Sequence, residues 1–214
     1  MPSDSSSATP RERLLDAAGE LFYLEGVHVG VDAVCKAAGV SKKSMYQLFR
    51  SKDALIAGSL TSVGVEFLAA LMPGTGRDGR SPRERILHIF ERQDQMSELQ
   101  AFRGCPFVNT ATELKQPGHP GSVVARAFKQ QMTDFFHTEA IAAGIADPAM
   151  LAAQLTMVFD GASARAVVRG QPLGGVGIAM ASAILSTSGL TEASAQQNRE
   201  RRRRLRNQRH GMFR

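Results

Sequence analysis

The sequence predicts an all-α protein, in which a small N-terminal domain of three helices precedes a larger helical bundle. Long Ala-rich segments repeat apolar residues at helical spacing, with glycine and proline between them, and no run of alternating β-branched residues suggests a strand. In addition, residues 28–53 carry the pattern of two short helices joined by a tight turn. A chain of 214 residues is long enough for both parts.

The first predicted helix begins near Pro10, which suits a first turn, and ends before Gly26. Its apolar residues recur on one face, which is expected to be buried: Leu14, Ala17, Ala18, Leu21 and Phe22. Residues 1–9 are polar and lack a hydrophobic signal core. They are predicted to form a short disordered leader, in a cytoplasmic protein.

Residues 28–53 predict two helices that meet at a glycine turn. Asp32 is the expected N-cap of the first helix, and Ser41 that of the second. Gly39 can adopt the left-handed conformation that turns the chain. Cys35 stands four residues before this glycine, where two steeply crossing helices leave room only for a small side chain. The residues expected to be buried are Val34, Cys35, Ala38, Val40, Met45, Leu48 and Phe49.

This pattern is typical of a helix-turn-helix, whose second helix lies in the major groove of DNA. Four residues are expected to approach base edges: Lys42, Lys43, Ser44 and Gln47. Three others are expected to hold phosphates: Ser41, Tyr46 and Lys52. The alternative is a helical hairpin from any soluble bundle, with solvated lysines. The small residue, the turn glycine and the capped basic helix agree independently, and together they favour DNA binding.

Residues 11–58 resemble the DNA-binding region of the tetracycline-repressor (TetR) family of bacterial transcription regulators. The matching positions are Ala17, Leu21, Phe22, Gly26, Ala38, Gly39, Val40, Ser41, Tyr46, Phe49, Lys52 and Leu55. The resemblance implies a regulator of double-stranded operator DNA, with repression and release by a small-molecule effector as the expected mode. One position departs from the family. Gly30 stands where a Thr or Ser usually helps to cap the helix and touches a phosphate.

The DNA-binding domain is predicted over residues 10–56, and a ligand-binding and dimerisation domain over residues 57–190. A fourth helix begins near Ser51 and stops at Pro73. Further helices are predicted over residues 82–99, within 104–122, and over 123–143, 148–170 and 176–188. Ser81-Pro82 and Asp147-Pro148 are the helix-start signals among them.

Aromatic and methionine side chains with a few polar groups among them are typical of a small-molecule site, and they predict a mainly apolar effector. The candidate ligand-binding residues are Phe67, Phe90, Phe107, Asn109, Phe128, Met132 and Met157. The alternative is that these residues simply fill the core. Residues 104–113 also resemble a Gly-Cys-Pro/Leu-Phe-x-Asn-x-x-x-Glu segment that flanks the ligand cavity in some TetR-like proteins.

The last two predicted helices suit a homodimer interface. Four apolar residues recur at helical spacing on the first of them: Leu151, Leu155, Val158 and Ala162. Ala179 and Ala183 on the second allow close approach of a partner helix. Two such helices from each subunit would form a four-helix interface about a two-fold axis. The alternative is that both helices are internal to the monomer.

The net charge of +6 arises in the tail. The last sixteen residues contain eight arginines and one glutamate, and residues 1–198 carry a net charge of −1. Specific DNA binding must therefore come from a local patch formed by Lys42, Lys43, Arg50 and Lys52. Residues 191–214 are predicted to form a disordered basic tail that attracts phosphates of any sequence. This tail leaves a non-specific architectural DNA-binding protein as the alternative function.

Other function classes have little support in the sequence. The five histidines are scattered along the chain and no catalytic motif accompanies them, so we expect that the protein is not an enzyme. No Cys/His cluster has metal-ligand spacing, and no cofactor is expected. The sequence has no stretch of eighteen uncharged apolar residues, so we expect no membrane partner. Cys35 and Cys105 do not make a disulfide framework, and a redox role for Cys105 is an alternative to that of a small buried hydrophobe.

Overall fold

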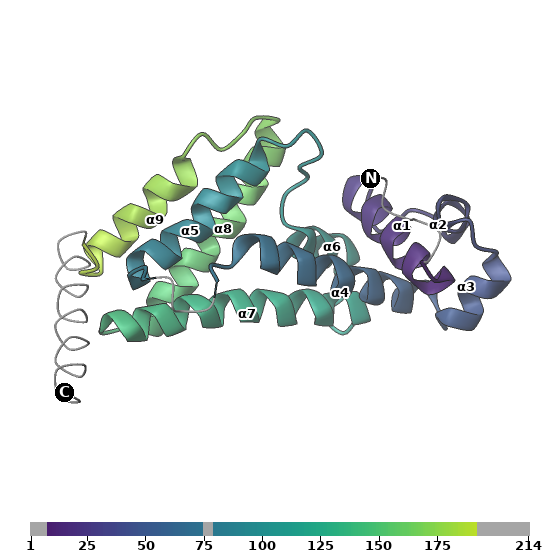
Figure 1. Ribbon diagram of the computed structural model, residues 1–214, viewed down its shortest axis with the longest axis horizontal. Coiled ribbons are helices and arrows are strands. Elements are labelled where there is room, and N and C mark those ends of the chain that lie inside the picture. The colour runs from purple at the N-terminus through teal and green to yellow at the C-terminus, as the bar shows by residue number, and fades with distance from the viewer. Residues whose placement is uncertain (1–7, 75–78, 192–214) are drawn as a thin grey trace, which may run out of the picture. The chain divides into compact units, whose positions relative to one another are not determined.

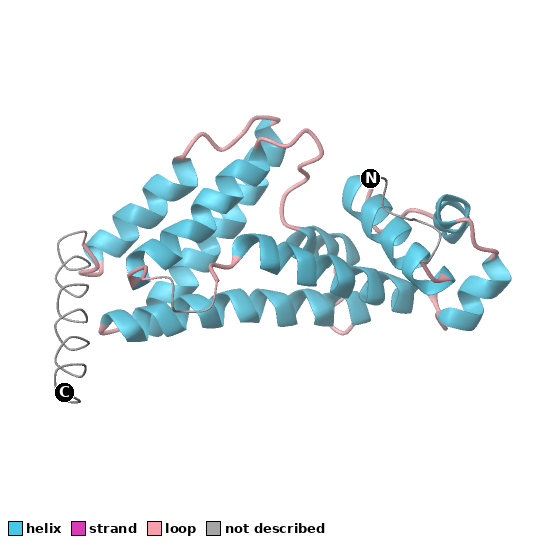
Figure 2. Cartoon of the chain, viewed as in Figure 1, coloured by secondary structure: helices cyan, strands magenta, loops and turns pink. Residues whose placement is uncertain are grey.

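A computed structural model describes residues 8–74 and 79–191, and every element of regular structure in these ranges is a helix (Figures 1 and 2). The prediction of an all-α chain is confirmed. The helices are α1 (Pro10–Leu24), α2 (Val31–Ala38), α3 (Lys42–Leu48), α4 (Lys52–Leu71), α5 (Pro82–Ser97), α6 (Pro106–Leu114), α7 (Pro120–Ala143), α8 (Pro148–Arg169) and α9 (Val176–Thr187). Most of the predicted leader and all but the first residue of the predicted tail lie outside the described residues.

Side-chain caps and prolines determine where most helices begin. Thr9 and Glu12 form a capping box at the start of α1, which places Thr9 in the folded part rather than in the leader. Ser81 and Glu84 form a second box at α5, and Asp147 caps α8. Helix α7 begins at residue 120, three residues before the predicted start. Proline is tolerated there because the first turn needs no N–H donor at that position.

The chain divides into two compact units. Of the described residues, unit 1 comprises 8–69 and 103–130, and so includes α1–α3, most of α4, α6 and the first half of α7. Unit 2 comprises residues 70–74, 79–102 and 131–191, and so includes α5, α8, α9 and the second half of α7. Helix α6 therefore packs in the unit that contains the glycine turn. The functional boundary after residue 56 stays a prediction.

The core of unit 1 contains the apolar face predicted for α1–α3. Leu14, Val34 and Met45 are fully inaccessible to solvent, and Phe49 is 5% exposed. The prediction for Leu48 was wrong, because 41% of this residue is exposed. Helix α3 ends at Leu48 and the backbone of Phe49 is extended, so that Phe49 turns into the core while Leu48 stays outside.

Helix α4 is the one described helix whose length and apolar composition would also suit a membrane span. Several of its apolar residues are instead used in packing: Leu55 and Leu71 are completely buried and Ile56 is 3% exposed, whereas Val65 is 62% exposed. Such burial is typical of the core helix of a folded domain.

The core of unit 2 combines stacked rings with a few paired polar groups. Phe90 stacks on Phe136, with ring centroids 5.9 Å apart, and meets Phe159 edge-on at 6.3 Å. The Gln93 amide donates to the carbonyl of Phe159 at 2.7 Å. These contacts join α5, α7 and α8 around one apolar centre.

Candidate nucleic-acid interface

Helices α2 and α3 are joined by the predicted glycine turn. Gly39 has φ 62° and ψ 36°, the left-handed conformation that glycine adopts most easily. The N–H of Val40 donates to the carbonyl of Cys35 at 3.0 Å, which closes the end of α2. Ser41 then caps α3, because its hydroxyl accepts the N–H of Ser44 at 3.1 Å. The turn and the second cap are as the sequence predicts.

The N-cap predicted for the first helix of this pair was wrong. Gly30 is the N-cap of α2 and has no side chain to accept a hydrogen bond, whereas Asp32 lies inside the first turn. An acidic residue is favourable there because it faces the positive end of the helix dipole. Asp32 also has a second use, as an ion-pair partner of Lys42 at 2.9 Å.

Two arginines of α1 hold the motif, and sequence patterns did not single them out. The Arg13 guanidinium donates to the carbonyl of Ala38 at 3.1 Å, at the last turn of α2. Arg11 lies 5.2 Å from the ring centroid of Phe49, at cation–π distance. A basic residue can satisfy the free carbonyls at the end of a helix, but only tertiary packing decides which helix end it reaches.

Cys35 serves as a small packing residue. Its side chain is buried among the core residues of α1–α3 and forms no disulfide. Burial raises the pKa of the Cys35 thiol, and the Asp32 carboxylate adds to that shift. The thiol therefore stays protonated at neutral pH and behaves as a small hydrophobe.

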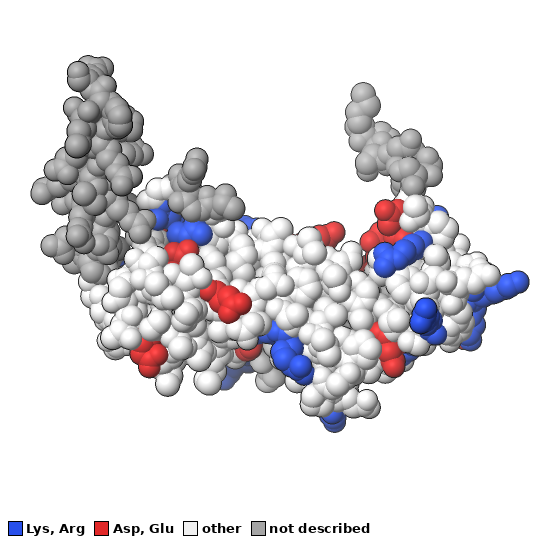
Figure 3. Space-filling model, turned by 90° about the horizontal axis from the view of Figure 1, so that it is seen from below, with Lys and Arg blue, Asp and Glu red and all other residues white. Residues whose placement is uncertain are grey.

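The outward face of α3 presents polar and basic side chains to solvent. Lys42, Lys43 and Gln47 are exposed, Tyr46 is 48% exposed, and Ser44 is half-buried. The hydrogen bond and the charge of Asp32 raise the pKa of Lys42, so this lysine remains cationic. Figure 3 shows lysine and arginine side chains on the surface formed by α1–α3, with acidic side chains near them. The structure thus brings the predicted base-contacting residues onto one accessible surface.

Lys52 and Ser51 lie at the start of α4. The Ser51 hydroxyl accepts the N–H of Ala54 at 3.1 Å and so caps the helix. Lys52 is half-buried, with its ammonium group 5.9 Å from the ring centroid of Phe22. The lysine stem is therefore held against the core of unit 1, while its charge lies at a helix N-terminus that suits phosphate binding.

Helix α6 and the residues beside it bond directly to the DNA-binding helices. The N–H of Val27, just after α1, donates to Glu113 of α6 at 2.8 Å. The Tyr23 hydroxyl donates to the carbonyl of Gly104 at 3.1 Å and accepts the N–H of Arg103 at 2.8 Å. His119 pairs with Asp53 of α4 at 3.2 Å when the imidazole is protonated. Any shift of α6 must therefore disturb the end of α1.

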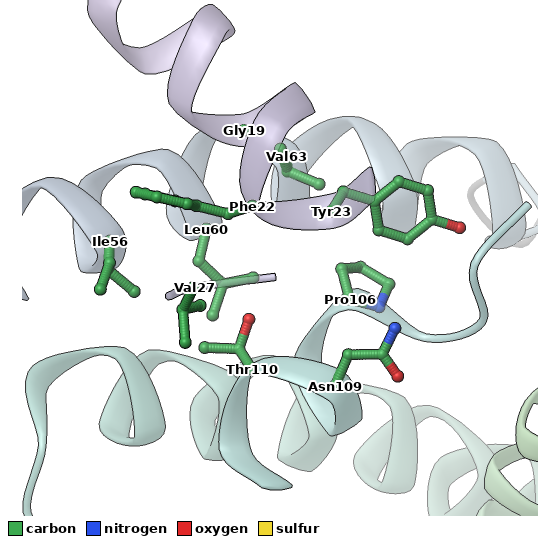
Figure 4. Close-up of a pocket in the computed structure, with 10 residues that line it drawn as sticks. All are labelled: Gly19, Phe22, Tyr23, Val27, Ile56, Leu60, Val63, Pro106, Asn109 and Thr110. Carbon is green, nitrogen blue, oxygen red and sulfur yellow. The ribbon is translucent and has the colours of Figure 1, made fainter. Parts of the chain in front are cut away.

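A small cavity lies between α1, α4 and α6 (Figure 4). Its volume is about 20 Å³, enough for one water molecule. In Figure 4, Phe22 and Ile56 lie toward one end of the cavity, while Tyr23 and Asn109 lie toward the other. Asn109 is one of the predicted ligand-binding residues, and its amide donates to the carbonyl of Arg103 at 2.6 Å.

The other predicted ligand-binding residues fall into two groups. In unit 1, Phe107 stacks on Phe128 at 4.9 Å and meets Phe67 edge-on at 5.6 Å. In unit 2, Phe90 and Met132 are buried. Met157, on α8, is 74% exposed and does not line that cavity. Among the residues described, no group of three or more His, Cys, Asp or Glu side chains could hold a metal ion.

Substituting Gly30 by serine is expected to stabilise α2 and to increase the affinity for DNA. The backbone at Gly30 (φ −70°, ψ 151°) suits any residue, and an added Cβ would meet open space. Relative to glycine, a serine N-cap adds only a few tenths of a kcal/mol, roughly. If the hydroxyl also reaches a phosphate, it adds a hydrogen bond but no charge, so Gly30→Ser should bind DNA of any sequence more tightly while the salt slope stays the same.

Gly30→Ala is the matched control, because it adds the Cβ without the hydroxyl. We expect it to lower stability by about 0.5–1 kcal/mol, since alanine is a poor N-cap. Chemical denaturation and DNA titration at several salt concentrations measure both effects. Equal DNA affinities of Gly30→Ser and Gly30→Ala would contradict the phosphate contact.

Comparison with known proteins places this interface in a family. The family model of bacterial regulatory proteins of the tetR family matches residues 14–58. A Streptomyces avermitilis structure, assigned to the TetR transcriptional regulators, is 48% identical. The match covers 85% of this chain and 99% of that one, with a TM-score of 0.82. A TetR-family regulator from Streptomyces coelicolor, SCO4454, is 25% identical over 84% of this chain and 95% of its own, with a TM-score of 0.75.

Curated relatives agree with the structural ones. The HTH-type transcriptional regulator YjdC of Escherichia coli is 22% identical over 159 residues, which are 74% of this chain and 83% of that protein. YxaF of Bacillus subtilis, an uncharacterized HTH-type transcriptional regulator, is 28% identical over 58% of this chain and 67% of its own. The helix-turn-helix geometry, the family model and the relative that is 48% identical agree with one another. The chain belongs to the TetR family of DNA-binding transcriptional regulators.

Proposed function

We propose that this protein is a homodimeric repressor that leaves its operator when a small, mainly apolar effector binds. The observation that carries the proposal is the capped, solvent-exposed helix α3 in a unit that also contains α6. Recognition helices at the surface support DNA binding. The bonds from Glu113 and Gly104 to the end of α1 support control of that helix from α6.

Operator recognition is assigned to the residues predicted from the sequence. Lys43, Ser44 and Gln47 approach base edges. Lys42 also does so when its ion pair with Asp32 breaks and its ammonium group contacts DNA instead. Ser41, Tyr46 and Lys52 hold phosphates. The Ser41 hydroxyl accepts the N–H of Ser44 and lies 2.8 Å from the Ser44 hydroxyl. When the Ser44 hydroxyl is the donor of that pair, Ser41 can donate its own hydrogen to a phosphate oxygen.

Dimerisation is assigned to the exposed apolar faces of α8 and α9. Leu151, Leu155 and Ala162 are buried within the chain, so the sequence prediction chose the inward side of α8. Met150, Met157 and Val168 are 56%, 74% and 85% exposed and follow helical spacing on the outward side, with Gly161 between them. On α9, Met180 is 52% exposed, and Ala179 and Ala183 are also exposed. A two-fold partner would cover both faces.

Effector release is assigned to the surroundings of α6. Phe107 and Asn109 lie on this helix, and Phe107 contacts the rings of Phe67 and Phe128. The Phe128 ring also packs closely against Gly64. A Cβ added at this glycine would lie only 2.6 Å from the ring. An apolar ligand must therefore displace a ring or move α6. To reverse operator occupancy almost completely, it must prefer the released state by about 10⁴-fold.

The test is a footprint of the protein on DNA next to its own gene, followed by a screen of small apolar molecules. We expect protection of a palindrome with half-sites about 34–36 Å apart, and its loss with one class of compound. Protection of random DNA to the same extent would favour the architectural alternative. A specific footprint that no compound releases, with transcription unchanged by deleting the gene, would contradict effector-controlled repression.

A further inference from the structure

The turn between α6 and α7 contains a second, solvent-accessible cavity that the proposed function does not use. Its volume is about 360 Å³, and it is lined by Ala111, Lys115, Gln116, Pro117, Ser122 and Arg126. None of these residues was a candidate for DNA or effector binding. The volume falls within the range of about 300–1,000 Å³ typical of small-molecule pockets.

Two cations and no carboxylate line this cavity. Lys115 and Arg126 come from the end of α6 and the second turn of α7. Arg126 donates one hydrogen bond to the carbonyl of Pro117 at 2.8 Å, which fixes its guanidinium beside the cavity. Two carboxylates on neighbouring elements contact other groups: Glu113 accepts the N–H of Val27, and an oxygen of Asp53 lies 3.2 Å from Nε2 of His119.

The electrostatic setting at the start of α7 favours a negative ligand. This helix has 24 residues, and its first turn contains no acidic side chain. The positive end of its dipole is therefore not neutralised by a neighbouring carboxylate on the same helix, while a cation in the second turn adds to the positive potential. An oxyanion at this end would interact favourably with the dipole and with both side chains.

Ser122 gives evidence for a bound ligand that is independent of the charges around the cavity. It lines the cavity and is only 6% exposed, yet its hydroxyl has no hydrogen-bond partner among the described residues. A buried polar group without a hydrogen-bond partner destabilises the folded state. A bound oxyanion would give this hydroxyl an acceptor.

The backbone conformation of Lys115 also favours a site for a negative ligand. Among the described residues other than glycine, Lys115 alone has a positive φ, of 52°, at the C-terminal cap of α6. Glycine or asparagine adopts this conformation more easily than a lysine does. A lysine at such a position places a cation at the cavity, where an apolar or neutral cap residue would place none.

We infer that the cavity between α6 and α7 binds an oxyanion of the phosphate class, held by Ser122, Lys115 and Arg126. The ligand is either a free phosphate-bearing molecule or a phosphate of bound nucleic acid, since both present the same chemistry. This site is separate from the apolar effector site, so neither proposal depends on the other.

The first arm of the test is calorimetric titration of the full-length protein with inorganic phosphate, with chloride keeping the ionic strength constant. We expect saturable binding that Arg126→Gln weakens by at least about 10-fold, the usual loss for a hydrogen bond to a charged group. Ser122→Ala should weaken binding by a similar factor without changing the net charge. Arg92→Gln, on α5 in unit 2, is the matched charge control and should leave phosphate binding unchanged.

Stability in the absence of phosphate shows whether Ser122 has a merely structural role. Because its hydroxyl is unpartnered, Ser122→Ala should unfold at the same denaturant concentration as the parent chain or a higher one. Added phosphate should stabilise the parent chain against denaturation and have a smaller effect on the Ser122→Ala chain. A marked loss of stability in Ser122→Ala without phosphate would mean that the hydroxyl has a partner in the protein, and would overturn the inference.

The second arm distinguishes the two sources of the phosphate. If nucleic acid supplies it, Arg126→Gln should flatten the salt slope of DNA binding by about 0.9 per subunit, and free phosphate should compete with DNA. If a free molecule supplies it, the salt slope should not change. Binding of phosphate that neither Arg126→Gln nor Ser122→Ala weakens would mean an adventitious ion only. That result, or the absence of both phosphate binding and a slope change, would overturn the inference.

Discussion

Replacing Met157 by glutamate is expected to separate the proposed homodimer into monomers and to weaken operator binding by at least about 100-fold. Met157 is 74% exposed on α8, although it is a large apolar side chain. In an interface with two-fold symmetry the new carboxylate appears on both subunits, where like charges cost several kcal/mol. Each 1.4 kcal/mol is a factor of about 10 in the dimer dissociation constant.

Sedimentation equilibrium and operator titration measure the two effects on the same samples. Ile141→Glu is the matched control, because Ile141 is also an exposed apolar residue of unit 2 (58%) but lies on α7. The control should remain dimeric and bind DNA normally. If Met157→Glu stayed dimeric at concentrations near the operator dissociation constant, the outward face of α8 would not be the interface.

A charge at Leu155, the position suggested by sequence spacing alone, would not serve this purpose. Leu155 is completely buried in unit 2. An unpaired charge at that position would unfold the unit, whether or not the chain dimerises.

Substituting Lys43 or Gln47 by alanine is expected to change which operator sequence the protein prefers. Both side chains are exposed on α3 and therefore accessible to DNA. Each lost base contact should cost about 1–3 kcal/mol per half-site on the preferred base pair and little on the others. A two-fold dimer carries each substitution twice, so the loss on a full palindrome is larger.

Lys52→Ala provides the contrasting case. A phosphate contact carries no sequence information, so this substitution should weaken all DNA sequences alike and reduce the salt slope by about 1 per half-site. Titration against the operator and its single-base variants measures the difference. If Lys43→Ala and Gln47→Ala lowered affinity equally for every variant, the proposed base contacts would be wrong.

The DNA-binding helices were predictable because their signals are local. A left-handed glycine, a serine N-cap and a small residue before the turn each act through their own neighbours in the sequence. The sequence therefore determined α2, the turn at Gly39 and α3, and with them the face that presents Lys43 and Gln47. Even here the prediction placed the N-cap of α2 at Asp32 instead of Gly30, because aspartate is favourable both as an N-cap and in the first turn of a helix.

Helical periodicity identified α8 and α9, but it could not say which neighbour covers each face. Leu155 and Met157 both belong to apolar stripes, and packing against the rest of unit 2 buries the first and leaves the second exposed. Likewise, the predicted ligand-binding aromatic residues share a composition, yet they divide between two compact units. Contacts between residues far apart in the chain decide such matters, and no local pattern encodes them.

The sequence by itself determined the all-α fold, the helix-turn-helix and the family. Only the tertiary structure showed Arg13 on the last turn of α2, Glu113 on the N–H of Val27, and Lys115, Ser122 and Arg126 around one cavity. Helix propensity and capping are short-range effects, whereas these groups meet because apolar burial brings distant helices together.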